Sequence, residues 1–360
     1  MRRSGPAAAR GALAALLALL SIATACAALP WPHLPRSAAS GERTSEGYLD
    51  LRGVTHVHTE RSRDSRGRLA DVVAAARSAG LDWVGFAEHR RRSARGERRL
   101  PSRVGALTLI PGWEVSASGG SLLLMGIRPR PPHFGSSGAA IAWAHERGGL
   151  AFAGHVERST LLREPGAALL DGVEVANLHA ELVARGGRFA LAALVLPASA
   201  ALRTLLHART ENIRAWEKLP GAPALTGGVD AHAKLRVLGS LGTLDRYVDA
   251  FRALTTHVHS QDREMSSILE ALRAGRSYVA FEGLATVDRF ELAAQGTHLR
   301  VRSPRAAHVQ LICDGAVADQ GVGEDLLLAP SPGARRCRAE VRVRGRLWIV
   351  SAHRILLPDS

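Results

Sequence analysis

The chain has 360 residues, 46% hydrophobic and 22% charged, which is long enough for one large domain plus a small one. This balance excludes wholesale disorder, a collagen-like fibre and low-complexity sequence. The formal net charge is +14, from 47 basic and 33 acidic residues, but only Lys218 and Lys234 are lysines. No basic stripe is interleaved with aromatic residues, so we expect no nucleic-acid partner.

The first 26 residues are typical of an export signal. Arg2, Arg3 and Arg10 form a positive region, residues 11–20 are apolar and uncharged, and small residues precede Cys26. The segment resembles a bacterial lipobox, which implies lipidation of Cys26 and a membrane-anchored protein of the cell envelope that faces the periplasm or the exterior. Cleavage by the ordinary signal peptidase and an uncleaved anchor are the alternatives.

Strand and helix patterns alternate along the chain after a predicted tether at residues 27–47, which is rich in proline, serine and alanine. The alternation covers residues 48–283 and is typical of an α/β protein with a parallel sheet or barrel. The expected strands are Leu51–His58, Leu81–Ala87, Leu107–Val115, Leu122–Ile127, Leu150–His155, Gly172–Ala176 and Ala224–Asp230. The expected helices are Leu69–Ala79, which Gly80 ends, Ala139–Arg147, Leu178–Arg185, Ala198–Leu219 and Met265–Ala274.

The pattern changes beyond residue 283, where arginines alternate with apolar residues at a period of two. We expect a small antiparallel β domain over residues 284–360. Its expected strands are Leu299–Ser303, His308–Cys313, Arg338–Val343 and Leu347–Ala352. In an exported protein, Cys313 and Cys337 could form a disulfide or remain two free buried thiols, and both alternatives stay open.

Histidines and carboxylates gather at the carboxyl ends of the expected strands. They are His56 and His58, Glu88 and His89, Glu114, His155, and Asp230 and His232. In a parallel barrel these strand ends meet at one face, where active sites are built. Imidazoles and carboxylates are ligands of divalent metals, so this recurrence at five strand ends predicts a metal site.

These residues resemble the motifs of the PHP (polymerase and histidinol phosphatase) metallohydrolases over about residues 50–280. The similar segments are His56-Val-His58-Thr59 followed by Asp64, Ala87-Glu88-His89, Pro111-Gly112-Trp113-Glu114, Ala153-Gly154-His155, Asp171–Asn177 and Gly228–His232. The resemblance implies a distorted (β/α)7 barrel with a small β domain behind it. It also implies a site for two or three divalent ions, either zinc, manganese or iron.

Carried over residue by residue, the resemblance implies eight metal ligands, with Glu114 between two ions and Asp230 also catalytic, taking a proton from the attacking water. The ligands are His56, His58, Asp64, His89, Glu114, His155, Asp230 and His232. Two departures stand out. Glu88 replaces an aspartate, and we expect it to contact the ligands without binding metal itself. The segment Ser118–Ser121 stands where the family often has a further histidine ligand. One pocket is therefore short of a ligand unless a residue such as His133 replaces it, which leaves two ions as the alternative to three.

An arginine-rich stretch follows the second expected strand. We expect Arg90, Arg91 and Arg92 to bind an anionic substrate, with a solvated loop as the alternative. The pair His257 and His259 has the same spacing as the first motif, but we interpret it as an ordinary polar segment near the mouth of the barrel.

The function implied is a metal-dependent hydrolase, most readily a phosphoesterase, acting on a small anionic molecule. Two alternatives stay open. One is hydrolysis of an amide, a carbamate or a carboxylic ester at the same site. The other is a non-catalytic binding protein built on a decayed barrel.

Overall fold

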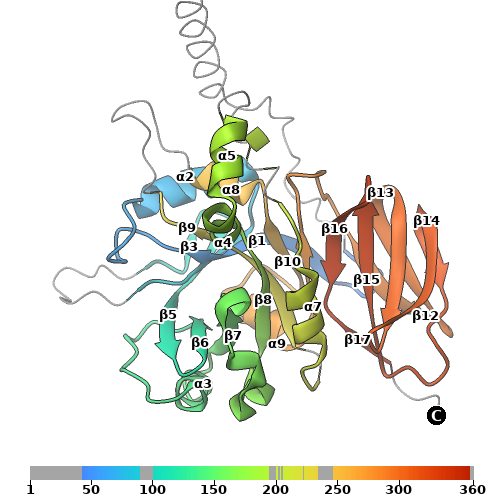
Figure 1. The fold of residues 1–360 in the computed structure, drawn as a ribbon, viewed down its shortest axis with the longest axis horizontal. Coiled ribbons are helices and arrows are strands. Elements are labelled where there is room, and N and C mark those ends of the chain that lie inside the picture. The colour runs from blue at the N-terminus through green and yellow to red at the C-terminus, as the bar shows by residue number, and fades with distance from the viewer. Residues whose placement is uncertain are drawn as a thin grey trace, which may run out of the picture.

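Strand β1 lies inside a large mixed sheet in the computed structural model (Figure 1). The structure describes residues 43–89, 100–193, 200, 201, 203, 206–221, 223–233 and 246–356. The parallel strands are β1 (Leu49–Val57), β2 (Trp83–Phe86), β4 (Leu107–Ile110), β7 (Leu150–Gly154), β8 (Gly172–Asn177) and β9 (Ala224–Ala231). Hydrogen bonds join β4, β2, β1, β9, β8 and β7 in that order.

The parallel strands form from short, largely apolar runs that are buried on both faces. Every residue of β2, β4, β7, β8 and β9 is buried. Packing is close enough that a Cβ atom on Gly53 of β1 would lie 2.0 Å from Cε2 of Trp83. Because paired strands run in the same direction, their carboxyl ends share one edge of the sheet.

Antiparallel strands complete this sheet. The strands β5 (Gly112–Ala117) and β6 (Gly120–Met125) form a hairpin beside β7, and the short β3 (Arg103–Val104) pairs with β4. Strand β10 (Thr255–Ser260) pairs with the first half of β1 on the side opposite β2, and β11 (Ser277–Ala280) follows it. The expected α/β class is confirmed, whereas the distorted (β/α)7 barrel stays a prediction.

The expected strand Leu107–Val115 is divided at Pro111 into β4 and β5. Proline has no N–H to donate to a ladder, and a Cβ atom on Gly112 would lie 2.2 Å from the carbonyl oxygen of Phe86. The backbone N–H of Glu114 then donates to the carbonyl of Glu88 (3.1 Å). This bond holds Glu114 beside the end of β2.

The helices match the sequence best where end signals are present. They are α2 (Leu69–Ala79), α3 (Ser137–His145), α4 (Leu178–Ala184), α5 (Gly186–Ala193), α7 (Thr210–Glu217), α8 (Tyr247–Phe251) and α9 (Met265–Arg273), with 3₁₀ turns at Val156–Arg158, Leu161–Arg163 and Pro165–Leu169. Helix α2 has the expected bounds because Gly80 follows it with φ 67°, a left-handed conformation that favours glycine. The expected helix Ala198–Leu219 is too long, since residues 206–209 are not helical and α7 begins at Thr210.

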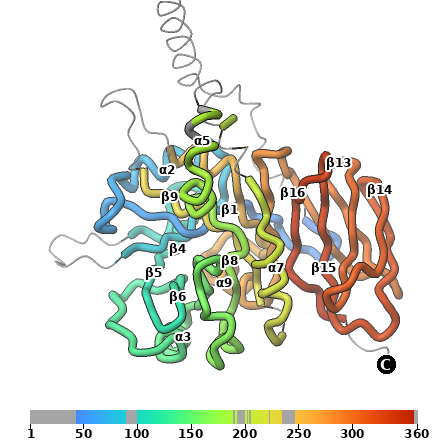
Figure 2. Tube along the Cα trace, viewed as in Figure 1, coloured from blue at the N-terminus to red at the C-terminus, as the bar shows by residue number. Residues whose placement is uncertain are grey.

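Beyond β11 the described residues form antiparallel strands, coloured orange to red in Figure 2. They are β12 (Glu291–Gln295), β13 (His298–Cys313), β14 (Ala316–Leu328), β15 (Arg336–Val343), β16 (Arg346–Ser351) and β17 (Arg354–Ile355). The expected strands Leu299–Ser303 and His308–Cys313 form one strand, β13. Its ladder with β14 shifts register between Arg302 and Ala307. Strand β14 was not predicted, because it is polar, contains Gly321 and Gly323 and is largely exposed.

The C-terminal strands have an apolar cluster of their own, which includes Phe290, Leu311 and Trp348. Strand β11 nevertheless pairs with β16, so the sheet continues across residue 283 and the division into domains stays a prediction. Of the two alternatives for the cysteines, the structure has the disulfide. Cys313 and Cys337 lie opposite each other in the β13–β15 ladder and are bonded.

Contacts also join these strands to α7. The ring of His353 stacks on that of Trp216, with centroids 4.1 Å apart and planes 8° apart. Nη1 of Arg336 donates to the carbonyl oxygens of Leu219 and Gly221, both at 2.8 Å, just beyond the end of the helix. Arg336 also donates to the carbonyl of Glu217, the last residue of α7, whose carbonyl has no partner within the helix.

Neither His257 nor His259 belongs to a candidate metal group among the described residues, but their expected position near the mouth of the barrel is wrong. Both lie in β10, which pairs with the first half of β1, away from His56. The His257 side chain is buried and its Nδ1 lies 2.9 Å from Oδ1 of Asp50 and 2.7 Å from Oη of Tyr278. The spacing of the two histidines therefore reflects strand alternation in a buried network.

The predicted export signal, the lipidation site Cys26 and most of the tether lie outside the described residues. Within the described part of the chain, no helix combines the length and the apolar character needed to cross a bilayer.

Candidate metal centre

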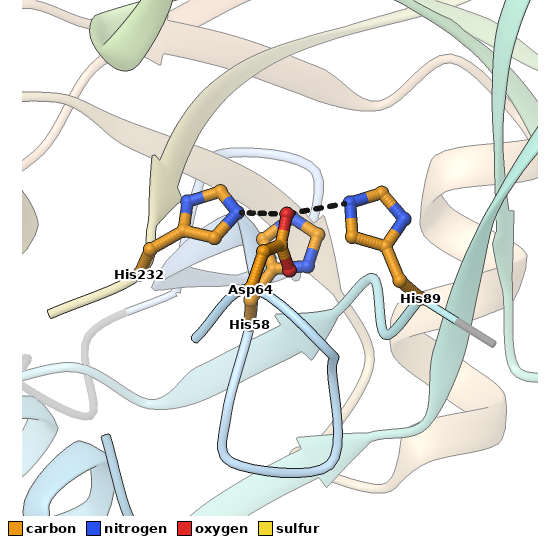
Figure 3. A group of neighbouring side chains, drawn as sticks. All are labelled: His58, Asp64, His89 and His232. Atoms are coloured by element: carbon orange, nitrogen blue, oxygen red, sulfur yellow. Dashed lines mark ion pairs between the residues drawn. The ribbon is translucent and has the colours of Figure 1, made fainter. Parts of the chain in front are cut away.

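The eight candidate ligands lie together where β1, β2, β7 and β9 end. Among the described residues, three overlapping groups of side chains offer ligand atoms within 4.8 Å of one another. The groups are His58, Asp64, His89 and His232, drawn in Figure 3; His56, His155 and Asp230; and His56, His58 and Glu114. Because His56 and His58 each belong to two groups, we call the whole set the metal centre.

The backbone is unusual at three of these residues. His56, His155 and Asp230 have φ angles of 63°, 47° and 48°, in the left-handed region that residues other than glycine rarely adopt. Such strain persists only where the surroundings enforce it, and it concentrates at functional sites. The β1–β2 ladder also shifts register here, so His56 and His58 reach the centre from an irregular strand end and not by regular alternation.

The group in Figure 3 is assembled around a carboxylate. Oδ2 of Asp64 lies 3.4 Å from Nε2 of His89 and 3.4 Å from Nε2 of His232. The rings of His58 and His232 stack with centroids 4.2 Å apart. Asp64 lies in the loop after β1, whereas the histidines follow β1, β2 and β9, so only the folded chain brings the four together.

Three buried atoms in this group show that it suits a cation. Nε2 of His58, Nε2 of His232 and Oδ1 of Asp64 make no hydrogen bond of normal geometry to any described residue. Leaving a buried polar atom unpaired costs about 1–3 kcal/mol, and native proteins seldom do so. Imidazole nitrogens and carboxylate oxygens are common ligands of divalent metals, so the residues fit such an ion.

Two carboxylates connect the groups. Glu114 lies between His89 (Oε2 to Nε2, 3.3 Å) and His155 (Oε1 to Nε2, 3.5 Å). Asp230 lies between His58 (Oδ1 to Nε2, 3.4 Å) and His155 (Oδ2 to Nε2, 3.4 Å). Since each carboxylate faces histidines of different groups with different oxygens, each could offer ligand atoms to more than one group if metal were bound.

The carboxylates stay ionised at neutral pH. Burial by itself would raise the pKa of Glu114 and of Asp230, but the charge on His56 lowers the pKa of both well below the usual range. Burial would also raise the pKa of Asp64, but the rings of His232 and His89, each with Nε2 3.4 Å from Oδ2, lower that pKa below its usual range. The centre therefore presents negative charge to a cation.

The histidines differ in proton affinity. Burial lowers the pKa of His58 to about 4, so this imidazole is neutral at pH 7, the form that binds metal. Burial would lower the pKa of His155 too, but a hydrogen bond with Glu157 and the charge on Glu174 raise it to about 9. The pKa of His56 is likewise raised, because Glu174 and other carboxylates outweigh burial. A metal that binds these histidines must displace their protons.

Glu174 has a role here that the sequence analysis did not assign. Its Oε2 lies 2.6 Å from Nδ1 of His56, and its Oε1 accepts a hydrogen bond from Nδ2 of Asn177 (2.8 Å). A Cβ atom on Gly228 would lie 1.8 Å from that Oε2, so only glycine leaves room for the carboxylate. The available signal was one charged residue inside the apolar strand Gly172–Asn177, which is buried throughout.

A serine lies where the resemblance leads one to expect another histidine. Oγ of Ser121, on β6, donates to Oε1 of Glu114 at 2.5 Å. His133 is exposed and belongs to none of the three groups, so it does not replace the missing ligand. Glu157, also not predicted, is 5% exposed and its Oε1 lies 3.4 Å from Nδ1 of His155.

Glu88 lies behind the metal centre and belongs to none of its groups. It accepts hydrogen bonds from Oγ1 of Thr59 and Oγ of Ser62, both at 2.6 Å. Oγ of Ser62 in turn accepts from the backbone N–H of His89 (2.8 Å) and lies 3.3 Å from Nδ1 of His58. These hydrogen bonds to Glu88 hold the loop after β1, which carries the candidate ligands His58 and Asp64.

The predicted substrate-binding residues Arg90, Arg91 and Arg92 lie outside the described residues. Arg103, at the far end of the same stretch, pairs with Glu264 of the segment before α9 (Nη1 to Oε1, 2.9 Å).

No protein-family model and no curated protein matches the chain. Among solved structures, it is similar to a two-domain protein from Bacteroides vulgatus that contains a predicted PHP-like metal-dependent phosphoesterase. The sequence identity is 15% and the TM-score is 0.45, over 89% of this chain and 99% of that one. At these values the likeness carries no weight for the activity, which rests on the residues of the metal centre.

Proposed function

We propose that the chain is a metal-dependent hydrolase of the PHP type that cleaves a phosphoester in a small anionic substrate. The observation that supports this most directly is the position of Glu114 and Asp230, each between histidines of two groups. Imidazole and carboxylate ligands suit zinc, manganese or iron(II), and the overlap of the groups suits two or three ions. Ions bound there would lower the pKa of water and offset the charge of the scissile phosphoryl group.

Asp230 is the proposed catalytic residue. Its side chain is buried and ionised, and Oδ2 lies 3.4 Å from Nδ2 of Asn177. A carboxylate held in this way can accept a proton from water at the metal centre. Glu174 supports the same chemistry by holding Nδ1 of His56, which keeps Nε2 of that ring 3.1 Å from Oε2 of Glu114.

The substrate and the location are proposed from the sequence. Arg90, Arg91 and Arg92 directly follow His89, and we propose that their guanidinium groups bind the substrate anion. We also propose that the export signal directs the protein to the cell envelope and that a lipid on Cys26 anchors it to the membrane.

The first test is the metal content of the full chain, purified without a histidine tag. The wild type should hold two or more equivalents, and a His56→Ala/His58→Ala variant at least one fewer. A His133→Ala/His207→Ala variant removes two exposed histidines outside the centre and should match the wild type. Less than half an equivalent in the wild type, even after reconstitution with zinc, manganese or iron(II), would contradict the proposal.

The second test is turnover of a phosphodiester, a phosphomonoester and a carbamate reporter. We expect the phosphoesters to be cleaved fastest, and an Asp230→Asn variant with native circular dichroism to lose about 10²–10⁴-fold in kcat. Faster turnover of the carbamate would favour carbamate hydrolysis on the same centre. A metal-loaded chain that turns over none of the reporters would favour a binding protein.

A further inference from the structure

A cavity outside the metal centre lies where the turn between β15 and β16 meets Arg203, in the segment that follows α5. Its volume is about 560 Å³. The residues that line it include Arg203, Leu284, Arg305, Arg342, Val343 and Arg344. None of these residues belongs to the metal centre. Sites for small molecules have volumes of about 300–1,000 Å³, so this cavity has the right size for one.

The lining of this cavity carries positive charge. The charge comes from arginines: Arg305 belongs to β13, Arg342 to β15, and Arg344 to the turn that follows. No described lining residue is acidic. Nη2 of Arg342 donates to Oε2 of Glu340 (2.6 Å), outside the lining, whereas the side chain of Arg344 has no ion-pair partner among the described residues. Crowded cations repel each other, and a bound anion would relieve that repulsion.

The walls of the cavity are held by specific contacts. Nε1 of Trp348 donates to the carbonyl oxygen of Ala285 (2.7 Å), and the guanidinium of Arg305 lies 5.7 Å from the centre of the Trp348 ring. Nη2 of Arg346 donates to the backbone carbonyl of Arg203 (3.4 Å), which ties the β15–β16 turn to the opposite wall of the cavity. The cavity is therefore formed before any ligand enters.

We propose that this cavity binds a small organic phosphate through its phosphate group. The planar guanidinium groups of Arg305, Arg342 and Arg344 offer paired donors that match phosphate oxygens. Leu284 and Val343 provide apolar surface for the organic part of the ligand. The proposal does not depend on the hydrolase activity, because it involves none of the residues of the metal centre.

The test is calorimetric titration of the purified full chain with phenylphosphonate, a phosphate-ester analogue whose carbon–phosphorus bond a phosphoesterase does not hydrolyse. The Arg305→Gln/Arg344→Gln variant removes two exposed cations from the cavity. The Arg214→Gln/Arg335→Gln variant removes the same charge from exposed positions elsewhere. We expect at least tenfold weaker binding in the first variant and less than a twofold change in the second.

Two further measurements exclude other sources of binding. Phenylphosphonate binding to the cavity should persist in the His56→Ala/His58→Ala variant. Binding at the metal centre would be lost in that variant. Circular dichroism of each variant checks the fold. Equal affinity in the cavity variant and its charge-matched control would overturn the proposal. Inorganic phosphate binding as tightly as phenylphosphonate would overturn the assignment of an organic ligand.

Discussion

Replacing Glu174 by glutamine tests how far the metal centre depends on a residue that is not itself a candidate ligand. Its side chain is 0% exposed, and Oε2 lies 2.6 Å from Nδ1 of His56. Glutamine keeps the size of the side chain but removes the charge. The contact then changes from a charge-assisted hydrogen bond to a neutral one, and the His56 ring loses the group that fixes its orientation.

The expected loss of metal affinity can be worked out from the contact between Glu174 and His56. A hydrogen bond to a charged group contributes about 1.5–3 kcal/mol, roughly twice a neutral one. The loss on substitution is therefore about 0.8–1.5 kcal/mol. A loss of about 1.4 kcal/mol corresponds to a factor of ten in affinity. We expect the affinity for Mn²⁺ or Zn²⁺ to fall about 10-fold, and no more than about 100-fold.

The assay is calorimetric titration of metal into chelator-treated protein, with urea unfolding of the same samples. Glu181→Gln is the matched control, because Glu181 is also a buried carboxylate but pairs with Arg209 and Arg185 outside the centre. The control should lose stability without losing metal affinity. If Glu174→Gln bound metal as tightly as the wild type, Glu174 would not position His56 and the reasoning would be refuted.

Three further predictions concern packing, the disulfide and pH. Gly228→Ala should lower the melting temperature and the metal content, because its Cβ atom would meet the Glu174 carboxylate, whereas Gly135→Ala, with open space around it, should change neither. Replacing Cys313 and Cys337 by serine frees a loop with a sequence separation of 24 and should lower the free energy of unfolding by about 3 kcal/mol in urea titrations. Burial, with the charges of two arginines, lowers the pKa of His353 to about 3, so the unfolded chain binds the extra proton between about pH 3 and 6.5. The free energy of unfolding of the wild type should therefore rise with pH in that window, by up to about 1.4 kcal/mol per pH unit. The His353→Phe variant should lack this rise. Urea titrations at several pH values measure the difference.

Each of these has a clear contrary result. Equal melting temperatures for the two glycine variants would mean that the space beside Glu174 is not needed. Serine variants as stable as the oxidised wild type would mean that the disulfide does not restrain the unfolded chain. Parallel pH profiles for the wild type and His353→Phe would mean that His353 takes up its proton in the folded state at an ordinary pH.

Most of the candidate ligands could be found in the sequence because they stand at or just after expected strands, whereas Asp64, in the loop after β1, was named only through the resemblance. His56, Glu114 and Asp230 all follow short apolar runs that predict buried strands, and strand ends of a parallel sheet share an edge. Helix α2 was equally clear, since its apolar period and Gly80 define both ends. Strands β10 and β14 were not found, because β10 is buried although its residues are mostly polar, and β14 is largely exposed.

By itself, the sequence determined which chemical groups the protein has and which of them stand at strand ends, because strand pattern and ligand type are both local. Only the tertiary structure decided which groups meet. Glu174 and His56 are 118 residues apart in the chain but 2.6 Å apart in space. Cys313 pairs with Cys337 because β13 and β15 are neighbours in register. Such contacts depend on how distant strands pack against each other, and no local pattern of residues encodes that packing.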